Sequence, residues 1–426
     1  MRITPGNIVV LGGGFAGLRA ALDLGRGIRK LKLTDRYTVM LIDRNQFHTF
    51  TPLLYEVATT TDGLATCSAL QSLTAYPFAN LLRGTGIAVL VGNVDAISLD
   101  ERVIRVTGKE VHFDYVLFAL GSETADFGIP GIREYALPLK TVADAIRIRD
   151  AVVARWHATP DDIDIVVAGG GPTGVELAGE LRAWTDELRL TAEKIPDVHI
   201  RLVEWGETIL NGFHPKIVAA ATRRLRALDI EVRTGTPVTS VTANAVTIAS
   251  SEVMPADLCV WTAGVQGVRA ADGLPFSRSP RGRVAVSETL GGSPAESPFS
   301  HRIYIAGDAS WYRDTTTDHA APQTAPVAAN QGAVAAHNIL EAIAADEDVR
   351  KPHRRPFRLH PYPYILPIGG KYAIAHIGPF IIRGKAAWAF KGLVELRYLI
   401  SIFPLSRAIT LWLCGLRTFL ASDRLG

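Results

Sequence analysis

The feature that most constrains this chain is a glycine-rich turn that occurs twice in its sequence. The first copy, Gly-x-Gly-x-x-Gly at residues 12–17, follows the apolar run Ile8–Leu11 and precedes the helical pattern LRAALDL. In such a turn the first glycine permits a tight bend, the second lets the backbone approach a pyrophosphate, and the third lets the helix pack against the strand. The helix N-terminus then offers unpaired N–H groups to the phosphates. The predicted dinucleotide contacts are Gly12, Gly14, Phe15, Ala16 and Gly17.

The second copy repeats every part of the first. The apolar run Ile163–Ala168 leads into Gly-x-Gly-x-x-Gly at residues 169–174, and another helical pattern follows. One such motif is weak evidence by itself, but here each copy lies between a strand pattern and a helix pattern, as dinucleotide binding requires. The predicted contacts of this copy are Gly169, Gly171, Pro172, Thr173 and Gly174.

An acidic residue ends the strand that follows each turn. The run YTVMLID ends at Asp43, and the run HIRLVE ends at Glu204. A carboxylate at this position can accept hydrogen bonds from both hydroxyls of a ribose. It favours a free 2′-hydroxyl over a 2′-phosphate, so the second turn is predicted to bind NADH rather than NADPH.

The wide separation of the two turns indicates two nucleotide-binding domains rather than a short structural repeat. The sequence therefore predicts an α/β fold with two Rossmann-like domains. Two dinucleotides in one enzyme suggest a donor and a relay. We predict that NADH delivers a hydride and that FAD, held permanently, receives it.

Composition narrows the class of protein. Of the 426 residues, 48% are hydrophobic and 20% charged, which is typical of a globular chain. The net charge of +3 is too small to indicate a nucleic-acid partner. Cys67, Cys259 and Cys414 are widely spaced and form no CxxC pair, so neither a redox dithiol nor a metal site is predicted. The N-terminal residues lack a signal-peptide pattern, which predicts a cytoplasmic location.

Three more motifs complete a familiar order along the chain: ALGS at 119–122, WTAGV at 261–265 and IAGDA at 305–309. With the two glycine turns they resemble the two-dinucleotide FAD/NAD flavoprotein reductases, in which an NAD domain is inserted into the FAD domain. The resemblance implies an FAD-binding domain at 1–118 and 265–345, an NAD(P)H-binding domain at 119–264, and a C-terminal acceptor-site and membrane-surface region at 346–426. It also implies that Asp308 binds the ribityl chain of the flavin.

The run HTFTPLLYEVAT at 48–59 and the basic, aromatic C-terminus resemble one branch of this group, the type II NADH dehydrogenases. These are single-subunit NADH:quinone oxidoreductases. The resemblance implies a catalytic role for Glu176, near the nicotinamide and flavin, and for Lys371, which would stabilise the anionic reduced flavin. Glu176 could equally be a helix N-terminal charge. The further cofactor contacts that the resemblance implies are Val94, Gly264, Gly307, Asp308 and Ala325.

The chain departs from that family at the helix after IAGDA. The family has AQxAxQ there, with two glutamines that line the quinone site, whereas this chain reads APVAANQG at 325–332. Pro326 and Asn330 take the places of the glutamines, and Gln331 points about 100° away from Asn330 on a helix. The predicted substrate-binding residues are Pro326, Asn330 and Gln331, in an acceptor pocket that differs from the family's.

The C-terminal stretch 393–420 is apolar with interruptions at Arg397, Pro404 and Arg407. A membrane-spanning helix needs about 20 largely apolar residues, so spanning is not predicted. Apolar residues at helical spacing with arginines off the stripe favour a helix that lies on the membrane surface, at its cytoplasmic face. A core-facing helix or a homodimer interface has the same periodicity.

Together these patterns predict a flavoprotein that passes hydride from NADH to FAD and then two electrons to a membrane quinone, without pumping protons. One alternative is a soluble FAD-dependent NAD(P)H reductase with a protein or biosynthetic acceptor. Another is a redox sensor that binds NADH and turns over slowly. A disulfide reductase is disfavoured, because no cysteine pair follows the first glycine turn.

Overall fold

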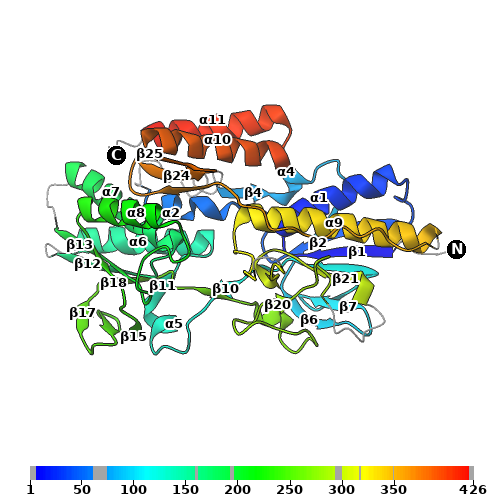
Figure 1. The fold of residues 1–426 in the computed structure, drawn as a ribbon, viewed down its shortest axis with the longest axis horizontal. Coiled ribbons are helices and arrows are strands. Elements are labelled where there is room, and N and C mark those ends of the chain that lie inside the picture. Colours follow the sequence, from blue (N-terminus) through cyan, green and yellow to red (C-terminus); the bar gives the residue numbers. More distant parts are fainter. Residues whose placement is uncertain are drawn as a thin grey trace. The chain divides into compact units, whose positions relative to one another are not determined.

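The computed structural model describes residues 6–60, 74–158, 162–191, 196–292, 300–315, 318–348 and 350–421. The chain divides into two compact units (Figure 1). The first unit comprises Met1–His48, Tyr76–Glu123 and Val265–Pro361. The second comprises Thr49–Ala75, Thr124–Gly264 and Tyr362–Gly426. Each unit is therefore assembled from three separate stretches of sequence.

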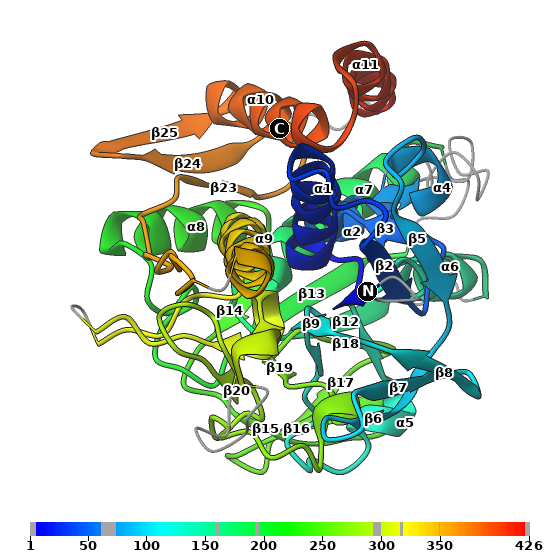
Figure 2. The same ribbon diagram turned by 90° about the vertical axis from the view of Figure 1, so that its right-hand side faces the viewer.

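The first unit is built on a parallel five-stranded sheet in the order β21-β9-β1-β2-β5. Its strands are β1 (Gly6–Leu11), β2 (Tyr37–Asp43), β5 (Ala88–Val91), β9 (Tyr115–Phe118) and β21 (Ile303–Ile305). The central strands are continuous apolar runs, as expected where both faces of a sheet are covered. Helices α1 (Phe15–Lys30) and α9 (Ala325–Asp348) pack side by side (Figure 2).

An antiparallel sheet of β6 (Val94–Ser98), β7 (Val103–Val106) and β8 (Lys109–His112) completes the core of this unit. Its inward side chains, among them Ile104, join Leu11 of β1 and Phe118 of β9 in one hydrophobic cluster. This cluster includes Leu11, the residue that directly precedes the first glycine turn, and so anchors the start of that turn.

The second unit repeats the plan with a parallel sheet in the order β11-β18-β12-β13-β14. Its strands are β11 (Ala136–Pro138), β12 (Ile163–Ala168), β13 (Val198–Val203), β14 (Ile230–Arg233) and β18 (Leu258–Trp261). Its longer helices are α6 (Val142–Ala158), α7 (Pro172–Thr191) and α8 (Pro215–Ala227). A small antiparallel sheet again accompanies it, made of β15 (Val238–Val241), β16 (Ala245–Ile248) and β17 (Val253–Pro255).

The C-terminal part of the second unit adds an antiparallel sheet and two helices. The strands are β23 (Tyr364–Pro367), β24 (Ala373–Ile377) and β25 (Phe380–Gly384), and the helices are α10 (Lys385–Ile402) and α11 (Leu405–Ala421). Pro404 separates the helices, and the indole N–H of Trp412 donates to the carbonyl of Gly392 at 2.7 Å to join them. Among the described residues, each helix is too short or too polar to cross a bilayer.

The remaining elements are short. They are β3 (Phe47–Thr49), η1 (Thr51–Leu53), α2 (Leu54–Val57), β4 (Ala75–Pro77), α4 (Phe78–Leu81), β10 (Glu123–Thr124), α5 (Ile132–Tyr135), β19 (Val265–Gln266), η3 (Arg269–Ala271), β20 (Val284–Ala285), η4 (Ser300–Arg302), η5 (Gly307–Ala309) and β22 (Ser310–Trp311). The predicted α/β class, with two Rossmann-type sheets and C-terminal helices, is confirmed.

Candidate functional site: two nucleotide sites and a buried charge cluster

The first glycine turn has the conformation that its sequence predicted. Gly12 has φ +97°, and a Cβ there would lie 2.3 Å from the carbonyl oxygen of Ala119. A Cβ on Gly17 would lie 1.8 Å from the carbonyl oxygen of Gly12, so the start of α1 can approach β1 only without a side chain. Gly14 faces open space and is exposed, which leaves its backbone accessible to a phosphate.

Asp43 lies at the end of β2 and holds this turn in place. Its Oδ2 accepts a hydrogen bond from the N–H of Gly13 at 2.6 Å, and its Oδ1 accepts one from the N–H of Asn45 at 2.7 Å. Burial raises the pKa of Asp43, and the backbone donors Asn45 and Gly13 oppose that rise. We call Gly12–Gly17 together with Asp43 the first nucleotide site.

His48 supports the first nucleotide site, a role that no motif in the sequence indicates. Its Nδ1 lies 2.8 Å from the carbonyl oxygen of Gly13, and its ring meets that of Phe15 edge-on at 5.1 Å. The side chain is fully buried, and burial lowers the pKa of His48 to about 4. The neutral imidazole can therefore donate from Nδ1 to Gly13 at physiological pH.

The IAGDA motif of the same unit is held by hydrogen bonds with two other segments. Gln331 is buried, and its Oε1 accepts hydrogen bonds from the N–H of Gly307 at 2.7 Å and from the hydroxyl of Ser310 at 2.9 Å. The hydroxyl of Ser122, from the ALGS motif, donates to Oδ2 of Asp308 at 2.9 Å. Gln331, one of the three predicted substrate contacts, therefore lies against the IAGDA motif, which the resemblance assigns to flavin binding.

These residues fit a bound flavin dinucleotide. The turn presents an accessible backbone at the N-terminus of α1, a helix of 16 residues. The buried Nε2 of Gln331 has no hydrogen-bond partner among the described residues, which leaves a donor available beside Gly307. Val94 is half-buried at the start of β6, and Ala325 is half-buried at the first position of α9, followed by the exposed Pro326. Their predicted roles remain predictions.

The second glycine turn has nearly the same geometry. Gly169 has φ +114°, and a Cβ there would lie 2.6 Å from the backbone nitrogen of Ala263. A Cβ on Gly174 would lie 1.8 Å from the carbonyl oxygen of Gly169, whereas Gly171 faces open space. Gly264, from the WTAGV motif, accepts a hydrogen bond from the N–H of Ala125 at 3.1 Å.

Glu204 holds the second turn as Asp43 holds the first. Its Oε2 accepts a hydrogen bond from the N–H of Gly170 at 2.6 Å, and its Oε1 accepts one from the N–H of Gly206 at 2.8 Å. We call Gly169–Gly174 together with Glu204 the second nucleotide site. Pro172 and Thr173 lie exposed at its rim.

Glu176 lies among buried charged side chains of the second unit. Lys391 of α10 places its Nζ 2.5 Å from Oε1 of Glu56 on α2 and 2.9 Å from Oε1 of Glu395 on α10. The hydroxyl of Tyr55 also donates to Glu56, at 2.8 Å. We call Glu56, Glu176, Lys391 and Glu395 the buried charge cluster.

Burial keeps a proton on Glu176 at neutral pH. Burial, together with repulsion from Glu56 and Glu180, raises the pKa of Glu176 to about 8, although Lys391 opposes the rise. Glu176 is half-buried and lies beyond the first turn of α7, which contains no acidic residue, so it does not act as a helix N-terminal charge. A protonated carboxylic acid can act as a general acid.

Lys371 lies in a loop that the second unit anchors firmly. The guanidinium of Arg224 donates to the carbonyls of Ile368 at 3.1 Å and Gly369 at 3.0 Å, and it covers the ring of Tyr372 at 4.5 Å. A Cβ on Gly179 of α7 would lie 2.7 Å from the backbone nitrogen of Gly369, so the loop approaches α7 closely.

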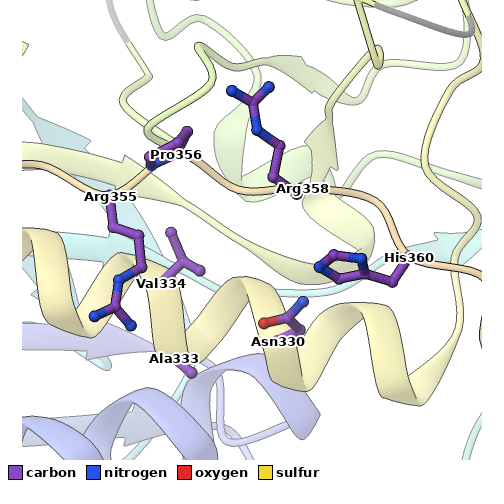
Figure 3. A pocket seen from close by; sticks show the side chains of 7 residues that line it. All are labelled: Asn330, Ala333, Val334, Arg355, Pro356, Arg358 and His360. Carbon is purple, nitrogen blue, oxygen red and sulfur yellow. The ribbon is translucent and has the colours of Figure 1, made fainter.

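Asn330 lies on a different face of α9 from Gln331 and borders a cavity of about 300 Å³ (Figure 3). The cavity is lined by Asn330, Ala333, Val334, Arg355, Pro356, Arg358 and His360. Figure 3 shows the side chains of Asn330 and His360 next to one another. The side chains of Asn330 and Gln331 therefore have different surroundings, as expected for adjacent residues of a helix.

Residues 6–332 match the family described as pyridine nucleotide-disulphide oxidoreductase. The chain belongs to the pyridine nucleotide-disulphide oxidoreductase family. This oxidoreductase departs from the family's name in one respect, since its sequence has no cysteine pair after the first glycine turn.

Relatives of this pyridine nucleotide-disulphide oxidoreductase use quinones, according to their names. It is 28% identical over 397 residues to demethylphylloquinone reductase of Synechocystis sp., with 91% of each chain covered. It is 27% identical over 438 residues to a type II NADH:quinone oxidoreductase of Mycobacterium tuberculosis, covering 95% of this chain and 86% of that protein. The predicted resemblance to type II NADH dehydrogenases is confirmed.

Solved structures share the fold. The structure of NDH2 from Plasmodium falciparum in complex with NADH has a TM-score of 0.82 at 18% identity, with 99% of both chains covered. The sulfide:quinone oxidoreductase of Aquifex aeolicus has a TM-score of 0.74 at 19% identity, with 93% of this chain and 91% of that chain covered. At these identities the likeness concerns the fold alone.

Proposed function

We propose that this chain is a FAD-dependent NADH:quinone oxidoreductase that does not pump protons. The observation that carries the proposal is the pair of nucleotide sites, each with an acid bonded to the middle N–H of its glycine turn. Bound FAD would supply the redox chemistry, taking a hydride from NADH and passing two electrons to the acceptor. The names of the relatives supply the acceptor class, a quinone.

The residues of this chain then have distinct tasks. Asp43 and His48 hold the first glycine turn in the conformation that receives the FAD pyrophosphate. Glu204 receives the ribose hydroxyls of NADH and repels a 2′-phosphate. Reduction of a quinone to a quinol consumes two protons, and Glu176, protonated at neutral pH, is proposed to supply one.

The acceptor site itself is a further part of the proposal. Pro326 and Asn330 replace the glutamines of the resembling family, and Asn330 borders the cavity described above. Lys371, in the loop anchored by Arg224, is proposed to stabilise the negative charge of reduced flavin. The resemblance to the type II NADH dehydrogenases supports the role of Lys371, whereas Pro326 and Asn330 depart from that family's motif.

We also propose that α10 and α11 rest on the cytoplasmic face of a membrane. Several of their large apolar side chains are exposed, as is unusual for a helix pair that faces only water; they are Phe390, Leu393, Val394, Ile400, Leu405, Ile409 and Leu413. Arg407 is exposed on α11, where it can meet anionic lipid headgroups. A lipid-soluble acceptor agrees with this location.

The function is tested with purified, FAD-loaded protein. NADH oxidation is followed with menadione, with a short-chain ubiquinone and with no added acceptor. Rapid NADH oxidation that depends on quinone is expected. NADH oxidation that quinones do not accelerate would contradict the quinone part and favour a soluble reductase with another acceptor.

The membrane part is tested by flotation with vesicles that contain anionic lipid. The wild-type chain is expected to float, and a double variant Leu405→Ser, Leu413→Ser is expected to remain in solution with its NADH-dependent flavin reduction intact. A wild-type chain that stays in solution and elutes as a dimer would assign the apolar face to a second copy instead.

A further inference from the structure

An exposed tryptophan follows the acid of the second nucleotide site. Strand β13 ends at Val203, Glu204 comes next, and Trp205 follows with 70% of its surface exposed. Trp156, Trp184 and Trp261 of the same unit are buried. Leaving a large aromatic surface in water is unfavourable, and a ligand that covers it recovers that free energy.

The backbone on both sides of Trp205 is fixed. The N–H of Glu204 donates to the carbonyl of Arg233 at 2.8 Å, and the N–H of Thr236 donates to the carbonyl of Glu204 at 2.9 Å. The N–H of Gly235 donates to the carbonyl of Gly206, also at 2.8 Å. The backbone that carries the indole is therefore held in place, so little backbone conformational entropy is lost when a ligand packs against the ring.

The platform lies at the edge of the sheet where a dinucleotide binds. In the register of the parallel sheet, Ala168 is opposite Val203 and Val203 is opposite Arg233. The residues after these three, which include Gly169 and Glu204, therefore meet at the carboxyl edge of the strands. A ribose hydrogen-bonded to the carboxylate of Glu204 would bring its base close to the residues that follow Glu204, the first of which is Trp205.

We infer that Trp205 stacks against the adenine ring of NADH and sets the affinity of the second nucleotide site for adenine-containing dinucleotides. The inference rests on the proposed use of NADH, and it assigns a residue that the glycine motif does not include. Stacking of a base on an aromatic ring is tolerant of exact position, which suits a cofactor that must bind and leave in every cycle. Trp205 acts in binding and does not touch the reacting nicotinamide.

The test compares NADH with reduced nicotinamide mononucleotide, which lacks the adenosine half. Flavin reduction is measured for the wild type, Trp205→Ala and Trp205→Phe, with Leu190→Ala as the matched loss of an exposed apolar side chain, 79% exposed, on α7. Trp205→Ala is expected to raise the KM for NADH about tenfold at unchanged kcat. Trp205→Phe should restore most of the affinity, and Leu190→Ala should change nothing.

The mononucleotide separates stacking from a structural effect. Its kinetics should be the same in the wild type and Trp205→Ala, because it lacks the adenine ring that Trp205 is inferred to stack against. An unchanged KM for NADH in Trp205→Ala, or an equal loss with the mononucleotide, would overturn the inference. Failure of quinone to reoxidise the flavin would contradict the proposed function and leave this binding test unaffected.

Discussion

The two nucleotide sites share one design and differ in how they are enclosed. In both, an acid at the end of the next strand accepts a hydrogen bond of 2.6 Å from the middle N–H of the glycine turn. Around the first turn the chain packs tightly, with buried His48 beneath it and the ring of Phe78 where a Cβ on Gly13 would lie. Around the second turn Pro172, Thr173 and Trp205 are exposed.

The difference in packing agrees with the proposed roles of the two nucleotides, one a cofactor that stays bound and the other a substrate that exchanges. A turn that packs against buried side chains suits a cofactor that is kept through many cycles, since such packed structure opens rarely. An open site suits a substrate that must bind and leave each time. The first site therefore fits permanently held FAD, and the second fits exchanging NADH.

Valine substitutions at the third glycine of each turn are expected to have the largest effects on nucleotide binding. A side chain at Gly17 or Gly174 would lie 1.8 Å from a backbone oxygen of its own turn. Gly17→Val is expected to abolish flavin incorporation, and Gly174→Val to leave a yellow protein that NADH no longer reduces. Flavin absorbance relative to protein absorbance, before and after NADH, measures both.

The second glycine of each Gly-x-Gly-x-x-Gly motif supplies the control for that pair. Gly14 and Gly171 both face open space, so Gly14→Ala and Gly171→Ala should fold and should affect only ligand approach. Loss of flavin from Gly174→Val would show that the two sites are not independent in the way described.

Charge distinguishes the second unit as well. Lys391→Met would leave Glu56 and Glu395 buried without their cation, and breaking a buried pair in this way costs about 3–5 kcal/mol of unfolding free energy. Urea unfolding checks the value. Glu395→Gln added to Lys391→Met should recover part of the loss, and a single variant as stable as the wild type would show that the cluster contributes little.

His48 makes the first site sensitive to acid. Its pKa of about 4 in the folded chain is below the ordinary 6.5, so the unfolded chain binds more protons between these values. The stabilisation is therefore present above pH 6.5 and is lost as pH falls through 4, by roughly 3 kcal/mol for this one group. Unfolding free energies of wild type and His48→Gln should converge toward pH 4; curves that stay parallel would contradict the assignment.

The smallest predicted effect concerns Glu176 and the pH dependence of flavin reoxidation. Its pKa is raised to about 8, so the proton it holds is lost as pH rises above that value. If it supplies a proton to the acceptor, the rate of flavin reoxidation by quinone should fall about tenfold per pH unit above 8. Glu176→Gln should be slower at pH 7 and should lack this limb, whereas an identical pH profile would remove Glu176 from the mechanism.

Local features of the sites were predictable from sequence, and long-range ones were not. The glycine turns and their acids follow from strand, turn and helix patterns within short stretches, and the different directions of Asn330 and Gln331 follow from helix geometry. The partner of Glu56 lies 335 residues away, so no local pattern reveals the buried charge cluster. His48 likewise acts through burial, which a single sequence does not record.

The motifs also did not predict that the short stretch Thr49–Ala75 belongs to the second unit. Its described part includes α2, which contacts α6 and α7 of the same unit. Because α2 has only four residues, tertiary contacts rather than helix propensity decide where it packs.

The relay of electrons from NADH to a quinone through the two nucleotide sites is tested by sequential-mixing stopped flow. FAD-loaded protein is mixed with one equivalent of NADH and then with menadione, while flavin absorbance is recorded. Rapid bleaching is expected, followed by rapid recovery with quinone, with the flavin still bound to the protein after many cycles. Bleaching without recovery, or release of flavin at the rate at which NAD⁺ leaves, would contradict this relay.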